Sequence, residues 1–600
     1  MKVWQFILVS VAAFTLYANT LNHGFVLDDF SAITKNRIVQ KGTDGIPEIF
    51  TTHYRKGYWE NYGNLYRPLA LSSMALDYEL VGQKASFYHV VNVMYYVLIA
   101  LLLLTLMSRW FGETHTYLPL IITLLYLFHP IHTEVVANIK SRDELMSFAF
   151  LLAAFLFLWD YVAKSKPLYL VGTLLAFMLA LLSKESSIAF LVLLPLSAYV
   201  LQHTSLKKSL QIAGVLLIPV LVFIALRSMA LDGQAEAGKS LTESLSLTSS
   251  DPVESLLRAG YFLMMYLWKL LVPYPLAAQY VEWAGGISGT MKAIGAVGLL
   301  GHAALVWFGF KWVKQRNPLG LVVLFYLIAH FLHSNVILTI GTSFGERLLF
   351  TPSLAFSMLT GMLLVKYLGP QTKPMWAALA VVLLAYAALT VERNKAWESN
   401  MTLYAADVET QPESSLLNYW YALELTNTEY LASLSEAEEK QSLEKGMKHF
   451  EKALSLDHDF GNAEAQIGLT YYKLGVMDKA LIHYNKALDN GRGSIETLNN
   501  VAAIHFGNGD FEKAKYYYET AVEKNPNYTD AWGNLGITYA QLAEFESAER
   551  AFEKAIELSP KNAQFQLYMG MTLNELKREE EAALFFEKAF ELNPALRQSN

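Results

Sequence analysis

The chain has 600 residues, of which 53% are hydrophobic and 17% are charged, and its formal net charge is −7 at pH 7. This acidic balance, without a basic stripe, argues against nucleic-acid binding, and the absence of cysteine excludes disulfides, thiolate metal sites and cysteine nucleophiles. The average hides two regimes: apolar runs separated by short polar loops up to about residue 391, and a polar, periodic region from about residue 411 onward.

The apolar runs predict a polytopic membrane domain, because several approach the roughly 18–20 residues that cross a bilayer. The first run follows Lys2 and has no small-residue cleavage site, which favours a retained signal-anchor helix over a cleaved signal peptide. We expect about 11 transmembrane helices, at residues 4–21, 89–107, 117–128, 143–163, 167–183, 186–202, 209–229, 289–311, 318–333, 345–366 and 374–391. Residues 253–275 carry Arg258, Lys269 and two prolines, which favours an interfacial or re-entrant helix.

The lysines and arginines of the short loops predict the orientation, since they mark the cytoplasmic side. They place the N-terminus in the cytoplasm and the repeats outside it, and the short loops favour a bacterial inner membrane facing the periplasm; in a eukaryote the membrane would be that of the endoplasmic reticulum. The expected domains are a membrane domain at 1–391, containing a first extracytoplasmic loop at 22–88, a linker at 392–414 and a repeat domain at 415–600.

Unusual polar residues collect on the predicted extracytoplasmic face. Asp28 and Asp29 follow the first helix, and carboxylates at a membrane edge are costly and often functional. Arginine binds phosphate oxygens bidentately and lysine adds a point charge, so this face suits a phosphate-bearing lipid. The other candidates are Arg67, His129, His132, Glu134, Arg142, Glu144, Lys184, Glu185, Glu346 and Arg347.

Each of these motifs also has an ordinary structural explanation. Arg67 before Pro68 is typical of a turn with a solvated cation, and Lys184 resembles an anchor that reaches the membrane interface. His129 and His132 resemble metal ligands, but Pro130 interrupts the helix that would align them, so no metal site is predicted. Their joint placement on one face is what favours a functional site.

The region 415–600 has a 34-residue period, the length of a helix–turn–helix repeat. The clearest copy spans 529–562, a further copy spans 563–596, and an atypical first unit spans about 415–460. Small residues such as Gly536 allow close helix approach, and aromatic residues fill the space beside them. These are packing residues of an α-solenoid, a fold that commonly binds extended peptide.

The ordered set of motifs resembles the TMTC-type proteins, which are transmembrane proteins with tetratricopeptide repeats in the C-type glycosyltransferase superfamily. The resemblance covers essentially the whole chain and departs from the family at Ser141, where a glycine is expected before the arginine. The motifs that carry it are Leu27–Asp29 with Ala32 and Ile33, Tyr66–Leu69, His129–Glu134, Ser141–Leu145, Ser183–Glu185 and Gly345–Ser353. It implies an all-α fold and transfer of a sugar, mannose in the best-known members, from a polyprenyl phosphate to a protein Ser or Thr hydroxyl, with the essential acid in the aspartate pair.

For such a transfer we expect Asp28 to act as the general base, with Asp29 orienting it or holding the acceptor. Four cations are the candidates for stabilising the departing phosphate: Arg67, Arg142, Lys184 and Arg347. A single direct displacement would invert the anomeric configuration. No cofactor is assigned, and the sequence leaves open whether a divalent cation assists.

Three other functions are compatible with parts of the sequence. The repeats alone suit a non-catalytic membrane scaffold, and the many spans suit a transporter or flippase. A glycosyltransferase could also act on a glycan or lipid instead of a protein. Nearly charge-free spans disfavour the transporter, and a scaffold would tolerate Asp28→Asn.

Overall fold

The structure is a computed structural model, and it describes residues 2–59, 64–113, 115–231, 251–280, 287–336, 344–369, 372–457, 460 and 463–598. The described residues form helices and turns without a strand, so the predicted all-α fold class is confirmed. The chain divides into two compact units, Met1–Ser414 and Ser415–Asn600, which are described separately.

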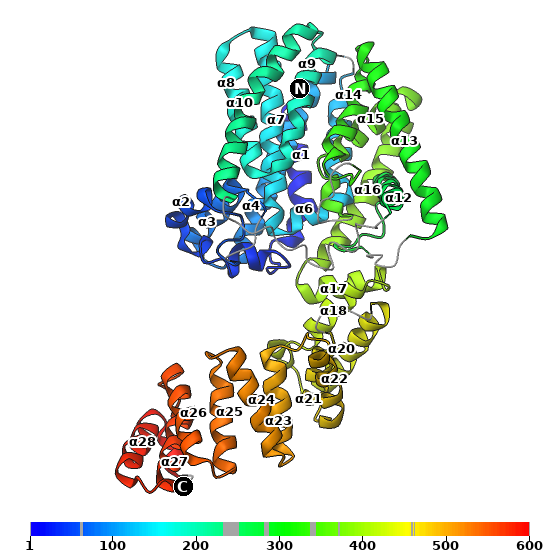
Figure 1. Cartoon of the computed structure of the whole chain (residues 1–600). Helices are drawn as coiled ribbons and strands as arrows, with labels where there is room; N and C mark the ends of the chain where they lie inside the picture. The colour runs from blue at the N-terminus through cyan, green and yellow to red at the C-terminus, as the bar shows by residue number, and fades with distance from the viewer. Residues whose placement is uncertain are drawn as a thin grey trace. The chain divides into compact units, whose positions relative to one another are not determined.

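The first unit is a bundle of apolar helices (Figure 1). In the described part of the chain, six helices are long and apolar enough to cross a membrane: α1 (Val3–Tyr17, continued to Thr20), α4 (Ala85–Phe111), α7 (Arg142–Lys164), α10 (Leu206–Leu231), α13 (Gly289–Lys314) and α16 (Lys373–Ala396). The pair α5 (Leu118–Phe128) and α6 (Thr133–Ala137) would form a seventh span, bent by 54°. Four apolar helices are shorter: α8 (Pro167–Ser183), α9 (Phe190–Leu201), α14 (Pro318–Phe331) and α15 (Ser353–Leu368). The chain is therefore a membrane protein, while the number of 11 spans stays a prediction.

Local sequence signals determine where several of these helices begin. Pro119, Pro167 and Pro318 occupy the first turn of α5, α8 and α14, where a missing backbone N–H costs nothing. Asn317 caps α14 by accepting the N–H of Leu319. The predicted span at 345–366 starts later than expected, because α15 begins at Ser353. The residues before it form the short helix η7 (Glu346–Leu349) and remain outside the long helix.

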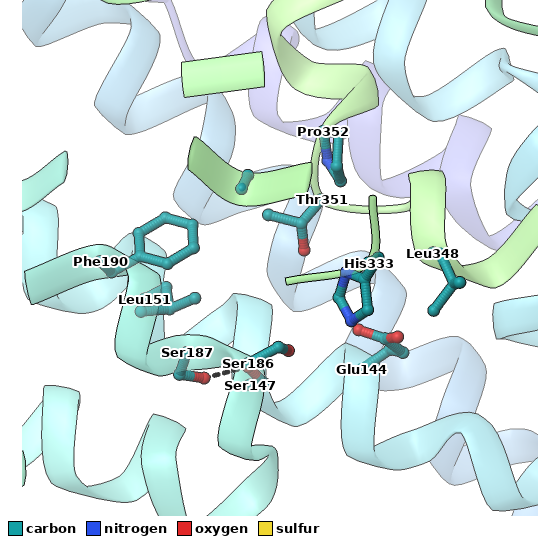
Figure 2. Close-up of a pocket in the computed structure, with 11 residues that line it drawn as sticks. Glu144, Ser147, Leu151, Ser186, Ser187, Phe190, His333, Leu348, Thr351 and Pro352 are labelled. Atoms are coloured by element: carbon teal, nitrogen blue, oxygen red, sulfur yellow. Dashed lines mark hydrogen bonds between the residues drawn. The ribbon is translucent and has the colours of Figure 1, made fainter. Parts of the chain in front are cut away.

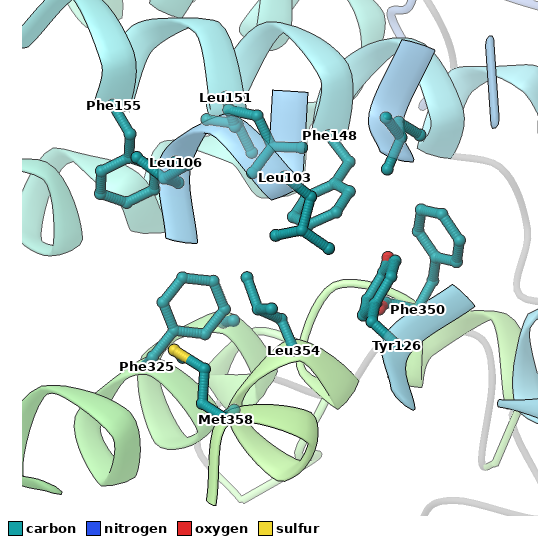
Figure 3. Packing of buried hydrophobic residues seen from close by; sticks show 14 of the residues in the cluster. Leu103, Leu106, Tyr126, Phe148, Leu151, Phe155, Phe325, Phe350, Leu354 and Met358 are labelled. Carbon is teal, nitrogen blue, oxygen red and sulfur yellow. The ribbon is translucent and has the colours of Figure 1, made fainter. Parts of the chain in front are cut away.

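Aromatic side chains pack the interior of the bundle (Figure 3). Phe148 of α7 lies 5.5 Å from Tyr126 of α5 and 5.6 Å from Phe350, measured between ring centroids. Between helices in a bilayer, such van der Waals packing replaces the hydrophobic effect as the main source of association. Because Phe350 directly follows η7, this packing also fixes the position of the polar residues of η7.

Residues between α1 and α4 form a small layer with its own core. It contains η2 (Phe30–Thr34), η3 (Val39–Gly45), α2 (Ile46–Thr51) and α3 (Pro68–Val81). Ile33, Ile49 and Met74 are buried there together with Tyr88 of α4 and Ile139, which precedes α7. The predicted first loop is therefore a packed layer attached to the ends of α4 and α7, and α2 and α3 lie together at one end of the bundle in Figure 1.

The helix α12 (Pro252–Leu271) packs closely on α13. A side chain at Gly260 would collide with the backbone of Gly295, and one at Gly298 would collide with the backbone of Gly260. α12 is not among the membrane-length apolar helices of the described chain. Its predicted interfacial or re-entrant position stays a prediction.

The segment 392–414, expected as a linker, is mostly helical and packs on the first unit. α16 continues to Ala396, and α17 (Asn400–Thr410) follows with a capping box at Ser399. Asp407 of α17 is fully buried, bonds Arg393 at 2.7 Å and accepts the N–H of Ala278 at 2.7 Å. These contacts make the segment part of the membrane unit instead of a free connection.

The second unit consists of helix pairs in series, coloured yellow to red in Figure 1. Its helices are α18 (Ser415–Leu425), α19 (Thr428–Leu431), α20 (Glu436–Leu456), α21 (Ala463–Lys473), α22 (Met477–Asp489), α23 (Ile495–Gly507), α24 (Phe511–Lys524), α25 (Thr529–Gln541), α26 (Phe545–Leu558), α27 (Ala563–Glu575) and α28 (Glu579–Leu592). At the predicted close approaches, glycines face aromatic rings of the paired helix. A Cβ on Gly536 would lie 2.7 Å from Phe552, and one on Gly570 would lie 2.8 Å from Phe586.

Replacing Gly536 by alanine should destabilise the repeat unit by about 1–3 kcal/mol, because the added methyl group would have to displace Phe552. The matched control is Gly507→Ala at the end of α23, where nothing lies within 4 Å of the new Cβ. Alanine there should raise stability by a few tenths of a kcal/mol up to about 1 kcal/mol. The measurement is the thermal transition of the repeat unit in the detergent-solubilised chain, and equal effects of the two substitutions would contradict the packing.

Candidate functional site

The two adjacent aspartates have opposite environments. Asp29 is fully buried: its Oδ2 accepts the N–H of Val26 at 2.9 Å, and its Oδ1 accepts the N–H of Lys140 at 2.7 Å. Burial raises the pKa of Asp29 to about 7, although both backbone bonds oppose the shift. The Asp28 side chain is 47% exposed and makes an ion pair with Arg55. Asp29 is therefore placed to hold the backbone, and Asp28 is placed to meet a ligand.

The backbone is strained immediately before this pair. Leu27 has a φ of 50°, a left-handed conformation that is costly for a bulky side chain. Its N–H is held by Asn400 Oδ1 at 2.9 Å, and the Asp29 contacts hold the residues that follow. The strain is thus maintained by contacts from α17 and from Lys140, two residues before α7.

Three cations act on Asp28. Arg55 Nη2 lies 3.1 Å from Asp28 Oδ1. Partial burial would raise the pKa of the Asp28 carboxyl, but the charges of Lys140, Arg55 and Arg347 lower it below its usual value. Asp28 is therefore ionised at neutral pH, which a base requires.

Two of the predicted phosphate-binding cations are already paired with carboxylates. Arg67 Nε donates to Glu185 Oε2 at 2.8 Å, and its Nη1 donates to Asp143 at 2.6 Å. Lys184 contacts Glu144, and burial lowers the pKa of Lys184 to about 7. The Arg67 and Lys184 side chains are less than 10% exposed. They organise the carboxylates around them and have little capacity left for a ligand.

Arg142, predicted to bind phosphate, is directed away from the aspartate pair. Its side chain is fully buried, pairs with Asp77 of α3, and donates to Asn92 Oδ1 at 2.8 Å and to the carbonyl of Tyr88 at 3.1 Å. These partners attach the first-loop layer to α4. The structure therefore assigns Arg142 a structural position, because every direction of its guanidinium is occupied by protein.

The two histidines are also committed to protein partners. His129 contacts the carbonyl of Leu270 at 3.0 Å and accepts the N–H of Ile131. His132 lies between the hydroxyls of Tyr96 and Ser353, at 3.0 and 2.8 Å. Both rings are fully buried. Within the described residues, no group of three or more His, Asp or Glu side chains is placed to hold a metal ion.

The two acidic residues Glu134 and Glu346 lie beside η7 but differ in role. Glu134 is buried and bonds Arg347 twice, accepting its backbone N–H at 2.9 Å and its Nη1 at 2.6 Å. Glu346 accepts the N–H of Ala277 at 2.7 Å and contacts the hydroxyl of Tyr280. Burial raises the pKa of Glu346 to about 8, so this carboxyl is largely protonated at neutral pH.

Lys140 and Arg347 keep side-chain donors that no described carboxylate occupies. The Arg347 side chain is 32% exposed and uses only Nη1 on Glu134 among its described side-chain contacts. Lys140 Nζ lies 3.6 Å from Asp143, too far for a hydrogen bond, and is 12% exposed. Both cations act on Asp28. An anion next to Asp28 could therefore accept hydrogen bonds from these two groups.

The ion pairs described above form one cluster that is close to neutral. Its cations are Arg55, Arg67, Lys140, Lys184 and Arg347, and its carboxylates are Asp28, Glu134, Asp143, Glu144 and Glu185. Asp29 is left out because its raised pKa makes it largely neutral below pH 7. The carboxylates neutralise most of the positive charge of the cluster. Positive charge remains available to a ligand mainly near Asp28, where some cation donors have no carboxylate partner.

A narrow polar pocket adjoins the cluster at Glu144 (Figure 2). Ser147 and Ser187, which both line it, bond each other at 2.7 Å, and Thr351 lines another wall. His333 lies beside Glu144, and its buried Nδ1 has no partner among the described residues. The pocket continues the polar surface from the charged cluster into the interior of the bundle.

Sequence reasoning did not single out Asp143 or two cations of the cluster. Lys140 lies two residues before Arg142 in a motif that was noticed for its arginine and acids. Arg55 lies in a polar turn with no motif around it, so nothing in the sequence separates it from other surface arginines. Only the fold places both of them beside Asp28.

Comparison with known proteins confirms the resemblance drawn from the motifs. Residues 505–566 and 564–596 match models of the tetratricopeptide repeat. The chain is 26% identical over 514 residues to "Protein O-mannosyl-transferase TMTC3" of Mus musculus, covering 78% of this chain and 52% of that protein. It is 25% identical over 409 residues to "Protein O-mannosyl-transferase F38B6.6" of Caenorhabditis elegans, covering 67% of this chain and 57% of that protein. The chain spans about half the length of the curated relatives it matches, and it is similar to TMTC-type proteins over about three quarters of its own length.

Two solved structures resemble the chain over a smaller part. One is a crystal structure of MamA, 21% identical with a TM-score of 0.25, covering 28% of this chain and 98% of that chain. The other is YrrB, titled a TPR protein with an unusual peptide-binding site. It is 22% identical with a TM-score of 0.27, and the match covers 32% of this chain and 92% of that chain.

Asp29→Asn should lower the free energy of unfolding by about 1–3 kcal/mol at pH 5, because an amide nitrogen cannot accept the second backbone N–H. Between pH 3.8, the usual pKa of this carboxyl, and about pH 7, the folded state keeps a proton on Asp29 that the unfolded chain releases. The free energy of unfolding of the wild type therefore falls as the pH rises through this range, and Asp29 causes no further fall above it. The difference between wild type and variant should therefore narrow from pH 5 to 7 and then stay constant, as measured by thermal unfolding in detergent.

The control for this prediction is Asp28→Asn, which removes a half-exposed ion pair and should cost less than about 1 kcal/mol. A wild-type advantage over Asp29→Asn that widens with rising pH would show that Asp29 is charged when folded.

Proposed function

We propose that this chain is a membrane glycosyltransferase that transfers a sugar, mannose by analogy with its named relatives, from a polyprenyl phosphate to a Ser or Thr hydroxyl of a protein. The reaction would take place on the extracytoplasmic side, in the periplasm or in the lumen of the endoplasmic reticulum. The repeats would recruit the acceptor protein. The names of the relatives suggest protein O-mannosyl transfer, and this chain spans about half of their length. The donor, the side of the membrane and the role of the repeats are parts of the proposal.

The observation that carries the proposal is the contrast between the two aspartates. Both carboxyl oxygens of Asp29 accept backbone N–H groups. Asp28 is instead half exposed and ionised, and it lies close to cations with free donors. A scaffold needs neither a strained backbone at Leu27 nor a half-exposed carboxylate among buried charges. Such an arrangement, costly to maintain, favours chemistry at Asp28.

In the proposed reaction, the acceptor hydroxyl attacks the anomeric carbon as the bond from that carbon to the phosphate oxygen breaks. Asp28 takes the hydroxyl proton, and the electron pair of the broken bond remains on the phosphate. A low pKa makes Asp28 a weak base, but the hydroxyl becomes acidic once its oxygen bonds to carbon, so late proton transfer suits it. One displacement of this kind inverts the anomeric configuration.

The departing phosphate would be stabilised by Lys140 and Arg347. Both act on Asp28, and both have donors that protein carboxylates do not occupy. Charge stabilisation of this type acts where negative charge develops in the transition state. Arg67 and Lys184, expected to share this task, would instead hold Asp143, Glu144 and Glu185 in place.

Asp28→Asn should reduce transfer by at least about a hundredfold while the chain remains folded and inserted, because the base is lost. The assay uses the purified chain in liposomes with a labelled polyprenyl-phosphate mannose and a Ser/Thr-rich acceptor protein. Full activity of Asp28→Asn would favour a scaffold or a different base. If the folded wild type transfers no sugar from any polyprenyl-phosphate donor, the enzymatic proposal is wrong.

Lys140→Gln should reduce the transfer rate about ten- to a hundredfold, because one cation that faces the developing phosphate charge is removed. The matched control is Lys164→Gln at the opposite end of the same helical segment, where the lysine is 48% exposed and pairs with Asp160. This control should transfer at the wild-type rate. Wild-type kinetics in Lys140→Gln would remove Lys140 from the phosphate site.

A further inference from the structure

Arg55 makes the most direct contact with the proposed base. It lies in the turn after α2, and its Nη2 is 3.1 Å from Asp28 Oδ1. The Arg55 side chain is 25% exposed, and the Asp28 side chain is 47% exposed. No described contact involves the second carboxylate oxygen, Asp28 Oδ2. The ion pair therefore holds one oxygen of the carboxylate and leaves the other accessible.

The turn itself fixes the plane of the Arg55 guanidinium. The N–H groups of Tyr58 and Trp59 both donate to the carbonyl of Arg55, at 2.9 and 2.7 Å. This reversal brings the Trp59 ring over the guanidinium, with its centroid 4.9 Å from the guanidinium carbon. Such stacking favours a planar arginine over lysine and restricts its rotation. Trp59 is 45% exposed, so the stack lies at the surface beside the carboxylate.

Resting on the proposed function, we infer that Arg55 is a positioning residue of the transfer: it holds Asp28 by Oδ1 so that Oδ2 faces the acceptor hydroxyl, and Trp59 holds the plane of Arg55. While Arg55 holds the carboxylate, Asp28 makes no described ion pair with Lys140 or Arg347, the cations that the donor phosphate needs. Without Arg55, the carboxylate would turn toward Lys140 or Arg347 and neutralise the phosphate site.

Other groups also determine the charge state of Asp28. The charged or titratable groups that face it come from five places. They are Asp29 beside it, Tyr54 and Arg55 from the turn after α2, Lys140 from the short helix η5 (Ile139–Ser141), Asp143 from the first turn of α7, and Arg347 from η7. Arg55 is one of three cations that lower the pKa of Asp28. Removing Arg55 should therefore raise the pKa of Asp28. The acid limb of the pH profile, where protonation of Asp28 stops activity, should then move to higher pH.

The test compares Arg55→Gln, Arg55→Lys and Trp59→Ala in the liposome transfer assay from about pH 2.5 to 8, because the pKa of Asp28 lies below its usual value of 3.8 in the wild type. Arg55→Gln should lower kcat about ten- to a hundredfold, as a displaced catalytic group does, and should move the acid limb to higher pH. Arg55→Lys keeps the charge, so its acid limb should stay near that of the wild type while kcat remains reduced. Trp59→Ala should lower kcat less than Arg55→Gln and leave the acid limb in place.

The control is Lys41→Gln, which removes an exposed cation from the same layer and should leave kcat and the pH profile unchanged. Membrane insertion and thermal stability of each variant are measured in parallel, and Arg55→Lys provides the decisive comparison if Arg55→Gln folds poorly. The inference is overturned if either Arg55 variant shows both the kcat and the acid limb of the wild type. Failure of the proposed function is distinguishable, since it appears as no transfer by the wild type or full transfer by Asp28→Asn.

Discussion

The bond between the Asp29 carboxylate and the backbone N–H of Lys140 is the contact on which the rest of the site depends. It joins the residues after the first helix to the short segment before α7, which are more than a hundred positions apart in the chain. Asp29 also accepts the N–H of Val26, so the backbone turns tightly and Asp28 is presented outward. A buried carboxylate is stable only with such partners, and backbone groups provide them without adding a second charge.

Pairing of charges decides which cations are available for a ligand. Arg67, Lys184 and Arg142 each have carboxylate partners within the protein, and burial makes separation of such pairs costly. Lys140 and Arg347 lie in the same region but are less fully occupied. A phosphate group can therefore interact with these two without breaking a buried ion pair. The distribution of carboxylates, more than the number of arginines, defines where an anion would bind.

The site also depends on how the helices pack. Phe350 packs on Phe148 and holds η7, which carries Arg347, against the end of α7. The first-loop layer has its own apolar core, and Arg142 attaches it to α4 and α3. Asp407 and Asn400 from α17 hold the segments at Ala278 and Leu27. The charged residues therefore come from short elements that are each fixed by packing outside the cluster.

The sequence by itself determined the elements of this protein: apolar runs long enough to cross a membrane, a 34-residue repeat with its glycines opposite aromatic rings, and a polar face containing the aspartate pair. These follow from local composition and spacing, which one chain displays directly. Only the tertiary structure decided the surroundings of each residue on that face. It separated Asp28 from Asp29, moved Arg142, His129 and His132 into structural positions, and brought Arg55 and Lys140 to Asp28. The physical reason is that burial and ion pairing are set by residues distant in the chain, so the availability of a charged side chain cannot be read from its neighbours in sequence.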